Sequence, residues 1–424
     1  MFPRFSWEQG SVVPPLPHPP GECFARDEVI ARSLSYLGDL VSVILPGGVG
    51  VGKTAIALTL LHHDHVKTRF SVNRYFMRCD DLANSLRVFL ERLTNAIGLP
   101  PIGSMELLRP HLTRLRPLHP LMLVLDGVEC ILDPLAGESK QIAATIEEVS
   151  RYSGLCLLAT SRMAVNISGF QTIEVPNISG DGARDIFYSL CSLDRSAVID
   201  NLIASLDSHP LSTVFLARVA CEENWDELTL VREWDDIRTG ILRSGDNQSL
   251  GIAIESALAT PMIRHFGPAV KEILEAIAPF PIGVEERRVG NVLPGIDGIG
   301  DIIDILCRFY LVERQDRLVK MISPLRFHFL DNALTMIHTP RAEENGNDSI
   351  TEERDEVPCH TAIGGSCNVL QSDCGVDIFQ SPTHIYRWSS TRWKRAQPSH
   401  CWGEAACPSR PRKGGLVPRL VSGP

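Results

Sequence analysis

Several features that would place the chain in a membrane, on a secretory route or on a nucleic acid are missing from its 424 residues. No run of about 18 apolar residues occurs, so no segment is expected to span a bilayer. The first residues, MFPRFSWEQGSVVPPLPHPPGE, lack the apolar core of a secretory signal. The net charge of −10 argues against nucleic-acid binding by the whole molecule, because contacts to phosphates need a basic face. We therefore expect a cytoplasmic protein without a membrane partner.

The cysteines have neither the spacing of a zinc site nor that of a disulfide framework. Seven of the twelve are scattered singly between residues 23 and 307, as expected for reduced thiols of an intracellular protein. The other five lie between residues 359 and 407, where no C-x₂-C pair occurs. No zinc site is therefore expected there.

Short apolar, β-rich runs alternate with stretches long enough to form crossover helices. Such runs are typical of buried parallel strands. The sequence therefore predicts an α/β domain with a doubly wound parallel sheet over residues 22–178. The predicted strands are VSVIL (41–45), VNRYFMR (72–78), LMLVLD (121–126) and LCLLAT (155–160).

The pattern becomes helical from residue 179 to 260, with apolar residues three and four positions apart. Residues 261–336 then combine helical stretches with two short apolar runs, LVER and RLVKMI, about one turn apart. This order is typical of a small winged-helix domain that ends in a hairpin. A helical lid and a winged-helix-like domain are therefore predicted after the α/β domain.

The two ends of the chain have the composition of segments without a packed core. Six prolines in the first 20 residues indicate a flexible or polyproline-like lead-in over residues 1–21. Residues 341–356 carry seven acids against two bases, and residues 383–424 carry eight bases against one acid. No periodic apolar pattern accompanies these blocks, so the tail from residue 337 to 424 is predicted to be disordered.

One motif in VSVILPGGVGVGKTAIALTL (41–60) carries specific chemistry. Gly47, Gly52, Lys53 and Thr54 match the phosphate-loop pattern G-x-x-x-x-G-K-[ST], in which backbone N–H groups surround phosphate oxygens. The lysine would reach the β- and γ-phosphates, the threonine hydroxyl would bind Mg²⁺, and the positive end of the next helix would favour the anion. The candidate nucleotide-binding residues are Gly47, Gly48, Val49, Gly50, Val51, Gly52, Lys53, Thr54 and Ala55.

A phosphate loop needs further groups on the metal side, and two later strands supply them. Asp126 ends the run LMLVLD, where it can hold Mg²⁺ opposite Thr54. Glu129 follows three residues on and is a candidate for orienting the attacking water, although a solvated glutamate is the other reading. Arg162 follows LCLLATS and could place its charge on a γ-phosphate. No N-K-x-D guanine motif occurs, which favours ATP over GTP.

Several segments, in order, resemble the signal-transducing NTPases called STAND, in the NB-ARC- and NACHT-like branch abundant in mushroom-forming (basidiomycete) fungi. The resemblance covers about residues 20–330 and implies an ATPase core, a helical lid and a winged helix that close around ADP and rearrange for ATP. It further implies that Phe24 and Arg26 lie beside the adenine and ribose, and that Pro210 caps the base. The segments are CFARDE, GGVGVGKT, LMLVLDGVECILDP, LLATSR, VPNISGDGARDIF, HPLSTVFLA and MISPLR.

The sequence also departs from that family. His209 replaces the usual apolar residue before Pro210, and Val49 stands where the family favours glycine, which leaves the loop less free to adopt positive φ. The Met-His-Asp triplet is replaced by MISPLRFHF, in which either Arg326 or His328 takes the place of the histidine or no residue does. No repeat of 34 or about 40 residues follows, so we expect the sensor of such proteins to be missing or to be supplied by another chain.

Three functions are compatible with these patterns. The first is an NLR-like ATP/ADP switch, with slow hydrolysis and nucleotide-dependent self-association or binding of signalling proteins. The second is a conventional phosphotransferase or ATPase, for which no acceptor-binding signature is present. The third is a winged-helix regulator that binds DNA, but GDIIDILCRFY (300–310) offers few base-reading or phosphate-binding side chains. The first is our expectation.

Overall fold

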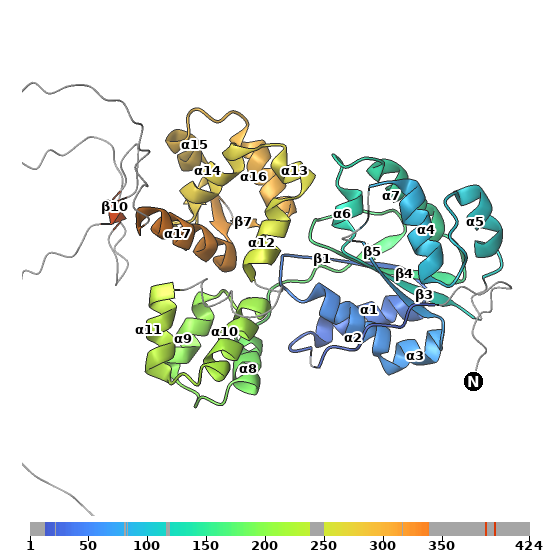
Figure 1. Ribbon diagram of the computed structural model, residues 1–424, viewed down its shortest axis with the longest axis horizontal. Coiled ribbons are helices and arrows are strands. Elements are labelled where there is room, and N and C mark those ends of the chain that lie inside the picture. The colour runs from blue at the N-terminus through green and yellow to red at the C-terminus, as the bar shows by residue number, and fades with distance from the viewer. Residues whose placement is uncertain are drawn as a thin grey trace, which may run out of the picture. The chain divides into compact units, whose positions relative to one another are not determined.

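The computed structural model describes residues 13–21, 23–79, 82, 84–115, 119–237, 250–315, 317–338, 386–387 and 394–395 (Figure 1). The expectations for residues 1–12 and for most of the tail, including its five cysteines, lie outside these residues. In the tail, β9 (Tyr386–Arg387) and β10 (Lys394–Arg395) pair antiparallel.

A five-stranded parallel sheet forms the first part of the chain, in the order β2-β3-β4-β1-β5. The four predicted strands are confirmed, and their side chains alternate between the two faces because successive residues of a strand point in opposite directions. Leu121, Leu123 and Leu125 of β3 enter one core cluster, and Met122 and Val124 enter the other. The strands are β1 (Ser42–Pro46), β2 (Arg74–Arg78), β3 (Leu121–Asp126), β4 (Leu155–Ser161) and β5 (Phe170–Thr172).

Helices cover both faces of this sheet, which makes it doubly wound as predicted (Figure 1). One face carries α1 (Asp27–Gly38), α2 (Lys53–His62) and α3 (Asp64–Phe70). The other carries α4 (Leu86–Ala96), α5 (Met105–Leu112), α6 (Glu129–Leu132) and α7 (Ser139–Ser150). Both faces of the central strands are thus dry, which is why their sequences are continuously apolar.

Two features of this region were not predicted. β5 is an edge strand of three residues with one buried side chain, so it leaves no apolar run to recognise. The contacts of the proline-rich segment are the second feature: Val13 and Leu16 are partly buried against the core, and His62 Nε2 lies 2.8 Å from the carbonyl oxygen of Pro17. A few apolar side chains are enough to hold a segment that forms no regular element.

Four helices follow, namely α8 (Gly180–Leu190), α9 (Ala197–Ser205), α10 (Pro210–Glu222) and α11 (Glu227–Ile237). Their starts show ordinary capping chemistry. The hydroxyls of Ser179 and Ser196 accept hydrogen bonds from the N–H groups of Gly182 and Ile199, and Pro210 occupies the first turn of α10, where its missing N–H costs nothing.

The last described region combines helices with a three-stranded antiparallel sheet, in the order β6-β8-β7. β7 (Val312–Gln315) and β8 (Leu318–Met321) form the predicted hairpin, and β6 (Val284–Glu285) adds a short edge. The helices are α12 (Leu250–Leu258), α13 (Pro261–Arg264), α14 (Pro268–Ile277), α15 (Glu286–Val292), α16 (Ile299–Arg308) and α17 (Ser323–His338). One apolar core cluster runs through the α8–α11 helices and this region.

Replacing Leu157 by alanine tests the central strand. Leu157 is fully buried in β4, so Leu157→Ala is expected to lower the free energy of unfolding by about 2–5 kcal/mol through lost burial and a residual cavity. Urea unfolding followed by circular dichroism measures the loss. Leu107→Ala is the control, because Leu107 is 67% exposed on α5 and its truncation should change stability by no more than about 0.5 kcal/mol. Equal losses in the two variants would contradict the assigned core.

Candidate functional site

The phosphate-loop residues connect β1 to α2, as the motif requires. Gly50 and Gly52 adopt φ of 75° and 97°, a conformation that side chains disfavour. Gly47 is needed for a different reason: a Cβ atom on it would lie 2.6 Å from the carbonyl oxygen of Val175. Val49 does not adopt positive φ, so the strained positions fall on the glycines that the chain retains.

Lys53 is the first residue of α2, and it is buried with its ammonium inside the loop. Its Nζ donates hydrogen bonds to the carbonyl oxygens of Gly47, at 2.8 Å, and Gly48, at 2.5 Å. Burial lowers the pKa of Lys53 to about 8, an effect opposed by the charges of Glu129 and Asp126 and reinforced by that of Arg162. The charges of the predicted catalytic residues Asp126, Glu129 and Arg162 therefore all affect the pKa of this ammonium.

Asp126 lies at the carboxyl end of β3, where its Oδ1 accepts two hydroxyl groups. Thr54 Oγ1 donates to it at 2.8 Å, and Thr160 Oγ1, from β4, donates at 2.7 Å. Thr54 is exposed while Thr160 is buried. A hydroxyl and a carboxylate side by side are hard oxygen donors of the kind that Mg²⁺ prefers, so the pair fits that ion.

Glu129 is only 3% exposed, in the short helix α6, and its carboxylate faces Arg162. The Arg162 backbone N–H donates to Glu129 Oε2 at 3.0 Å, and its side-chain Nε lies 3.4 Å from Oε1. Arg162 Nη1 also donates to Ser256 Oγ, in α12, at 3.2 Å. The structure thus joins the predicted water-orienting carboxylate and the predicted γ-phosphate reader in one ion pair, and ties the arginine to a helix outside the sheet domain.

The N-terminus of α10 lies directly against the phosphate loop. His209 Nε2 lies 2.7 Å from the carbonyl oxygen of Val49, and the N–H of Leu211 donates to the carbonyl oxygen of Gly50 at 3.3 Å. Because a carbonyl only accepts, Nε2 must carry the proton, which leaves Nδ1 to accept from the N–H of Ser212 at 3.3 Å. The Val49 side chain is buried in the core cluster that contains the α8–α11 helices. Val49, which stands where the resembled family favours glycine, therefore anchors the loop to those helices.

His209 is fully enclosed, with 1% of its surface exposed. Burial lowers its pKa to about 4, assisted by the charge of Lys53 and opposed by its bond to Val49. The ring is thus neutral at pH 7, in the tautomer that the loop requires.

Arg26 holds the loop from the other side. Its guanidinium donates to the carbonyl oxygens of Val51, at 2.6 Å, and Pro176, at 2.8 Å. The side chain is 5% exposed, and burial lowers its pKa. Phe24 packs against the core cluster that contains the α8–α11 helices, and Pro210 is partly buried next to His209. Their roles beside a base and ribose stay predictions.

The winged-helix-like region also reaches the loop and the end of β4. A methyl group placed on Gly48 would lie 3.6 Å from Tyr310 Cβ. Burial raises the pKa of Tyr310 to about 12, so the phenol stays neutral. Two residues after Arg162, the N–H of Ala164 donates to the carbonyl oxygen of Arg308 at 2.9 Å. His328, a candidate replacement for the family's triplet histidine, has its Nε2 3.1 Å from Glu255 Oε1.

Sequence reasoning missed the part that Thr160, Leu211 and Tyr310 take in the site, and it noted His209 only as a departure. Thr160 precedes Arg162 by two residues at the end of a recognised strand, so its position carried a usable signal. Leu211 and Tyr310 are ordinary residues far from the motif in sequence. Only folding brings them to the loop.

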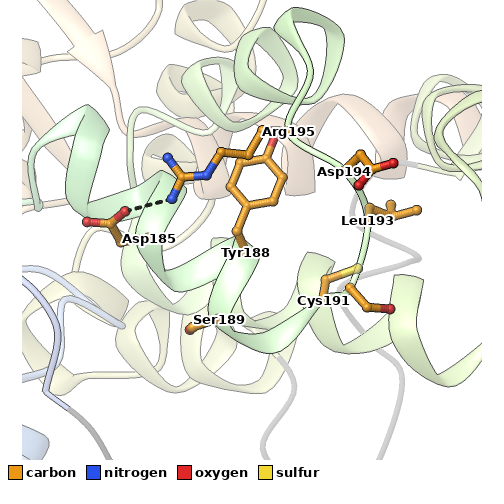
Figure 2. Close-up of a pocket in the computed structure, with 8 residues that line it drawn as sticks. Asp185, Tyr188, Ser189, Cys191, Leu193, Asp194 and Arg195 are labelled. Atoms are coloured by element: carbon orange, nitrogen blue, oxygen red, sulfur yellow. Dashed lines mark hydrogen bonds and ion pairs between the residues drawn. The ribbon is translucent and has the colours of Figure 1, made fainter.

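A separate depression of about 500 Å³ is lined by the C-terminal part of α8 and by the segment that follows this helix (Figure 2). Arg195 pairs with Asp185 at 3.3 Å there, and its guanidinium lies 5.1 Å from the centre of the Tyr188 ring. None of its lining residues belongs to the phosphate-loop site. Its open, exposed ion pair has no visible link to nucleotide chemistry.

Among the residues that the structure describes, no group of three or more His, Cys, Asp or Glu side chains could hold a metal ion. An Mg²⁺ held by one hydroxyl and one carboxylate would instead depend on phosphate and water for its remaining ligands, as is usual for this ion. Within the described part of the chain, no helix is both long and apolar enough to cross a membrane.

No protein-family model matches the sequence, and no curated protein matches it either. The fold nevertheless has many counterparts among solved structures. The Walker-type ATPase of Pyrococcus abyssi aligns with a TM-score of 0.56 and 15% identity, over 73% of this chain and 96% of that one. This likeness, together with the five-stranded parallel sheet, establishes a P-loop ATPase fold.

Two other solved structures align over a similar share of this chain. The ORC1 protein of Aeropyrum pernix, in complex with DNA, aligns with a TM-score of 0.39 and 15% identity over 75% of this chain and 95% of that one. A STAND protein with a tetratricopeptide repeat sensor, from Pyrococcus horikoshii, aligns with a TM-score of 0.31 and 13% identity over 73% of this chain and 45% of that one. At TM-scores below 0.5, neither likeness carries an argument about this chain.

The buried histidine makes stability depend on pH in a defined direction. The folded pKa of about 4 lies below the value of about 6.5 expected in the unfolded chain. The contribution of neutral His209 is therefore complete above about pH 6.5 and is lost as the pH falls towards 4, to a limit of about 3 kcal/mol. His209→Gln, which is neutral at every pH, should lose less thermal stability than the wild type between pH 7 and 5.

The control for this measurement is His265→Gln, because His265 is exposed. That variant should keep the pH dependence of the wild type when melting temperatures are compared. If His209→Gln and the wild type lost the same number of degrees between pH 7 and 5, the buried neutral histidine would not be responsible.

Proposed function

We propose that the chain is an ATP/ADP-operated switch of the STAND type, in which the phosphate loop transmits the state of the nucleotide to the helical lid (α8–α11) and to the winged-helix-like region. The observation that carries this proposal is the pair of hydrogen bonds from His209 and Leu211 to consecutive loop carbonyls. A loop that changes shape around a phosphate cannot leave those two bonds unchanged. The lid would then move or strain with it.

The metal side supports the same proposal. Thr54 and Asp126 would hold Mg²⁺, which would offset the charge of the nucleotide phosphates. Lys53, bonded to carbonyls of its own loop, would exchange those acceptors for phosphate oxygens, and Phe24, Arg26 and Pro210 would contact the base and ribose. Arg162 would exchange Glu129 for a γ-phosphate, and Glu129 would then be free to orient water for slow hydrolysis.

The contacts of Arg162 favour a switch over a conventional phosphotransferase. The arginine that would read the γ-phosphate is already bonded to Ser256 in α12, outside the sheet domain. A change in its partners would therefore be transmitted to the second half of the chain. Such a switch would act in the cytoplasm through nucleotide-dependent self-association or binding of a signalling protein. We give a DNA-binding role a lower rank, because no observation on the winged-helix-like region favours it.

Replacing the loop lysine tests the proposed ligand. Purified wild-type protein is expected to release ADP in a ratio near one per chain on denaturation, measured by chromatography. Lys53→Ala should release none, because a buried cation that contacts the phosphates is gone. Lys271→Ala is the control, since Lys271 is exposed on α14. An empty wild-type protein with rapid ATP turnover would indicate an ordinary enzyme instead.

Adding one methyl group to Gly50 tests the coupling between the loop and the lid. A Cβ there would lie 2.6 Å from His209 Cε1 and 2.9 Å from Leu211 Cβ, so the lid has to shift. Gly50→Ala is expected to raise the dissociation rate of a fluorescent ADP about tenfold or more. A tenfold increase corresponds to a loss of about 1.4 kcal/mol in the free-energy barrier to ADP release. Stopped-flow displacement by unlabelled ADP measures this rate.

The matched control is Gly298→Ala. Gly298 also adopts a left-handed backbone conformation, at φ 69°, but it lies at the start of α16. A Cβ atom added to Gly298 would lie 3.4 Å from Asp301 Oδ2, its nearest neighbour. Both variants strain the backbone, whereas only Gly50→Ala lies in the phosphate loop and clashes with the lid. Equal ADP release rates in both would count against coupling through this contact.

A further inference from the structure

Thr160 is a buried polar residue outside the groups assigned to the proposed switch. It lies in β4, next to β3, and is 2% exposed. Its hydroxyl joins two parts of the turn that follows β3: the N–H of Gly127 donates to Oγ1 at 2.9 Å, and Oγ1 lies 2.7 Å from Asp126 Oδ1. A strand that supplies only core side chains would need no such group at this place.

The direction of these bonds is determined by their chemistry. A threonine hydroxyl has one hydrogen to donate and two lone pairs to accept with. Because the N–H of Gly127 occupies a lone pair and an ionised carboxylate only accepts, the single hydrogen of Thr160 must point at Asp126 Oδ1. The backbone of one strand end thereby sets the orientation of the carboxylate through the side chain of the neighbouring strand.

The second hydroxyl on the same oxygen comes from the phosphate loop. Thr54 Oγ1 donates to Asp126 Oδ1 at 2.8 Å, so its lone pairs remain for a cation. Both hydroxyls end on Oδ1, and Oδ2 accepts no hydrogen bond from the residues that the structure describes. Asp126 thus has one oxygen committed to orientation and one left for a metal ion or its water.

We propose that Thr160 is the positioning residue of the Mg²⁺ site: it sets the rotation of the Asp126 carboxylate so that Oδ2 is directed to the ion that Thr54 binds. This inference rests on the proposed nucleotide function, because it concerns the metal that accompanies the nucleotide. Partners of a metal ligand that do not touch the metal typically change metal affinity by about 10–100-fold when they are removed.

The experiment measures nucleotide affinity rather than turnover. The dissociation constant of fluorescent ADP is determined across a titration of free Mg²⁺ and again in EDTA, for the wild type, Thr160→Val and Thr160→Ser. Thr160→Val keeps the shape of the side chain and removes the hydroxyl. It is expected to raise the midpoint, the free Mg²⁺ concentration at which half of the change in ADP affinity is reached, by about 10–100-fold. The affinity for ADP in EDTA should stay unchanged. Thr160→Ser, which retains the hydroxyl, should restore the wild-type midpoint to within about threefold.

Thr94→Val is the matched control for the cost of losing a buried hydroxyl. Thr94 is fully buried in α4, accepts a hydrogen bond from the N–H of Ile102 at 3.1 Å and donates to the carbonyl oxygen of Leu90 at 2.9 Å. It has the same donor and acceptor pattern as Thr160 without the carboxylate. Thr94→Val should therefore lose stability, measured by its melting temperature, and keep the wild-type Mg²⁺ midpoint. Thr160→Ala serves as a second loss variant should Thr160→Val not fold.

The outcomes separate this inference from the proposed function. Wild-type protein that binds no nucleotide would overturn both. Wild-type protein whose affinity depends on Mg²⁺, alongside Thr160→Val with the same midpoint, would overturn the positioning role alone. A raised midpoint that serine restores and that Thr94→Val does not share would establish it.

Discussion

The structure around the phosphate loop depends on one constraint of the backbone. A loop whose N–H groups turn inward to surround an anion must turn its carbonyls away, and buried carbonyls need donors. Here each carbonyl from residue 47 to 51 has one: Lys53 serves Gly47 and Gly48, His209 serves Val49, Leu211 serves Gly50, and Arg26 serves Val51. The loop is therefore held from outside as well as shaped from within.

Those donors come from widely separated parts of the chain, and this links the loop to its surroundings. Arg26 precedes the first helix of the sheet domain, whereas His209 and Leu211 begin α10. Neutral His209 is suited to its place because a charged ring would be costly to bury next to the ammonium of Lys53. The proposed coupling of the loop to the lid therefore needs no long pathway between them.

The charged groups of the site follow from the parallel arrangement of the strands. Asp126 ends β3, and Thr160 lies near the end of the neighbouring strand β4, with Arg162 just beyond it. Parallel strands place their carboxyl ends at the same edge, where a ligand can be met by several of them at once. The ion pair of Glu129 with Arg162 shows that these groups also serve as partners for one another.

The sequence determined the features that depend on local patterns. Four buried strands, the glycines of the phosphate loop, the lysine and threonine that follow them, and the β7–β8 hairpin were all readable because each is encoded within a few consecutive residues. The resemblance to a known family added roles for Arg26 and Pro210, but the identity of their partners was not contained in the motif.

Only the tertiary structure decided which distant groups complete the site. His209 looked like a departure from a family pattern and became the donor to Val49, and Thr160 looked like a strand residue and became a partner of Asp126. β5 and the packed proline-rich segment escaped recognition because they bury too few side chains to produce a pattern. The physical reason is the same throughout. A local pattern reports how residues are spaced along the chain, whereas hydrogen-bond partners and buried charges depend on which segments the fold brings together.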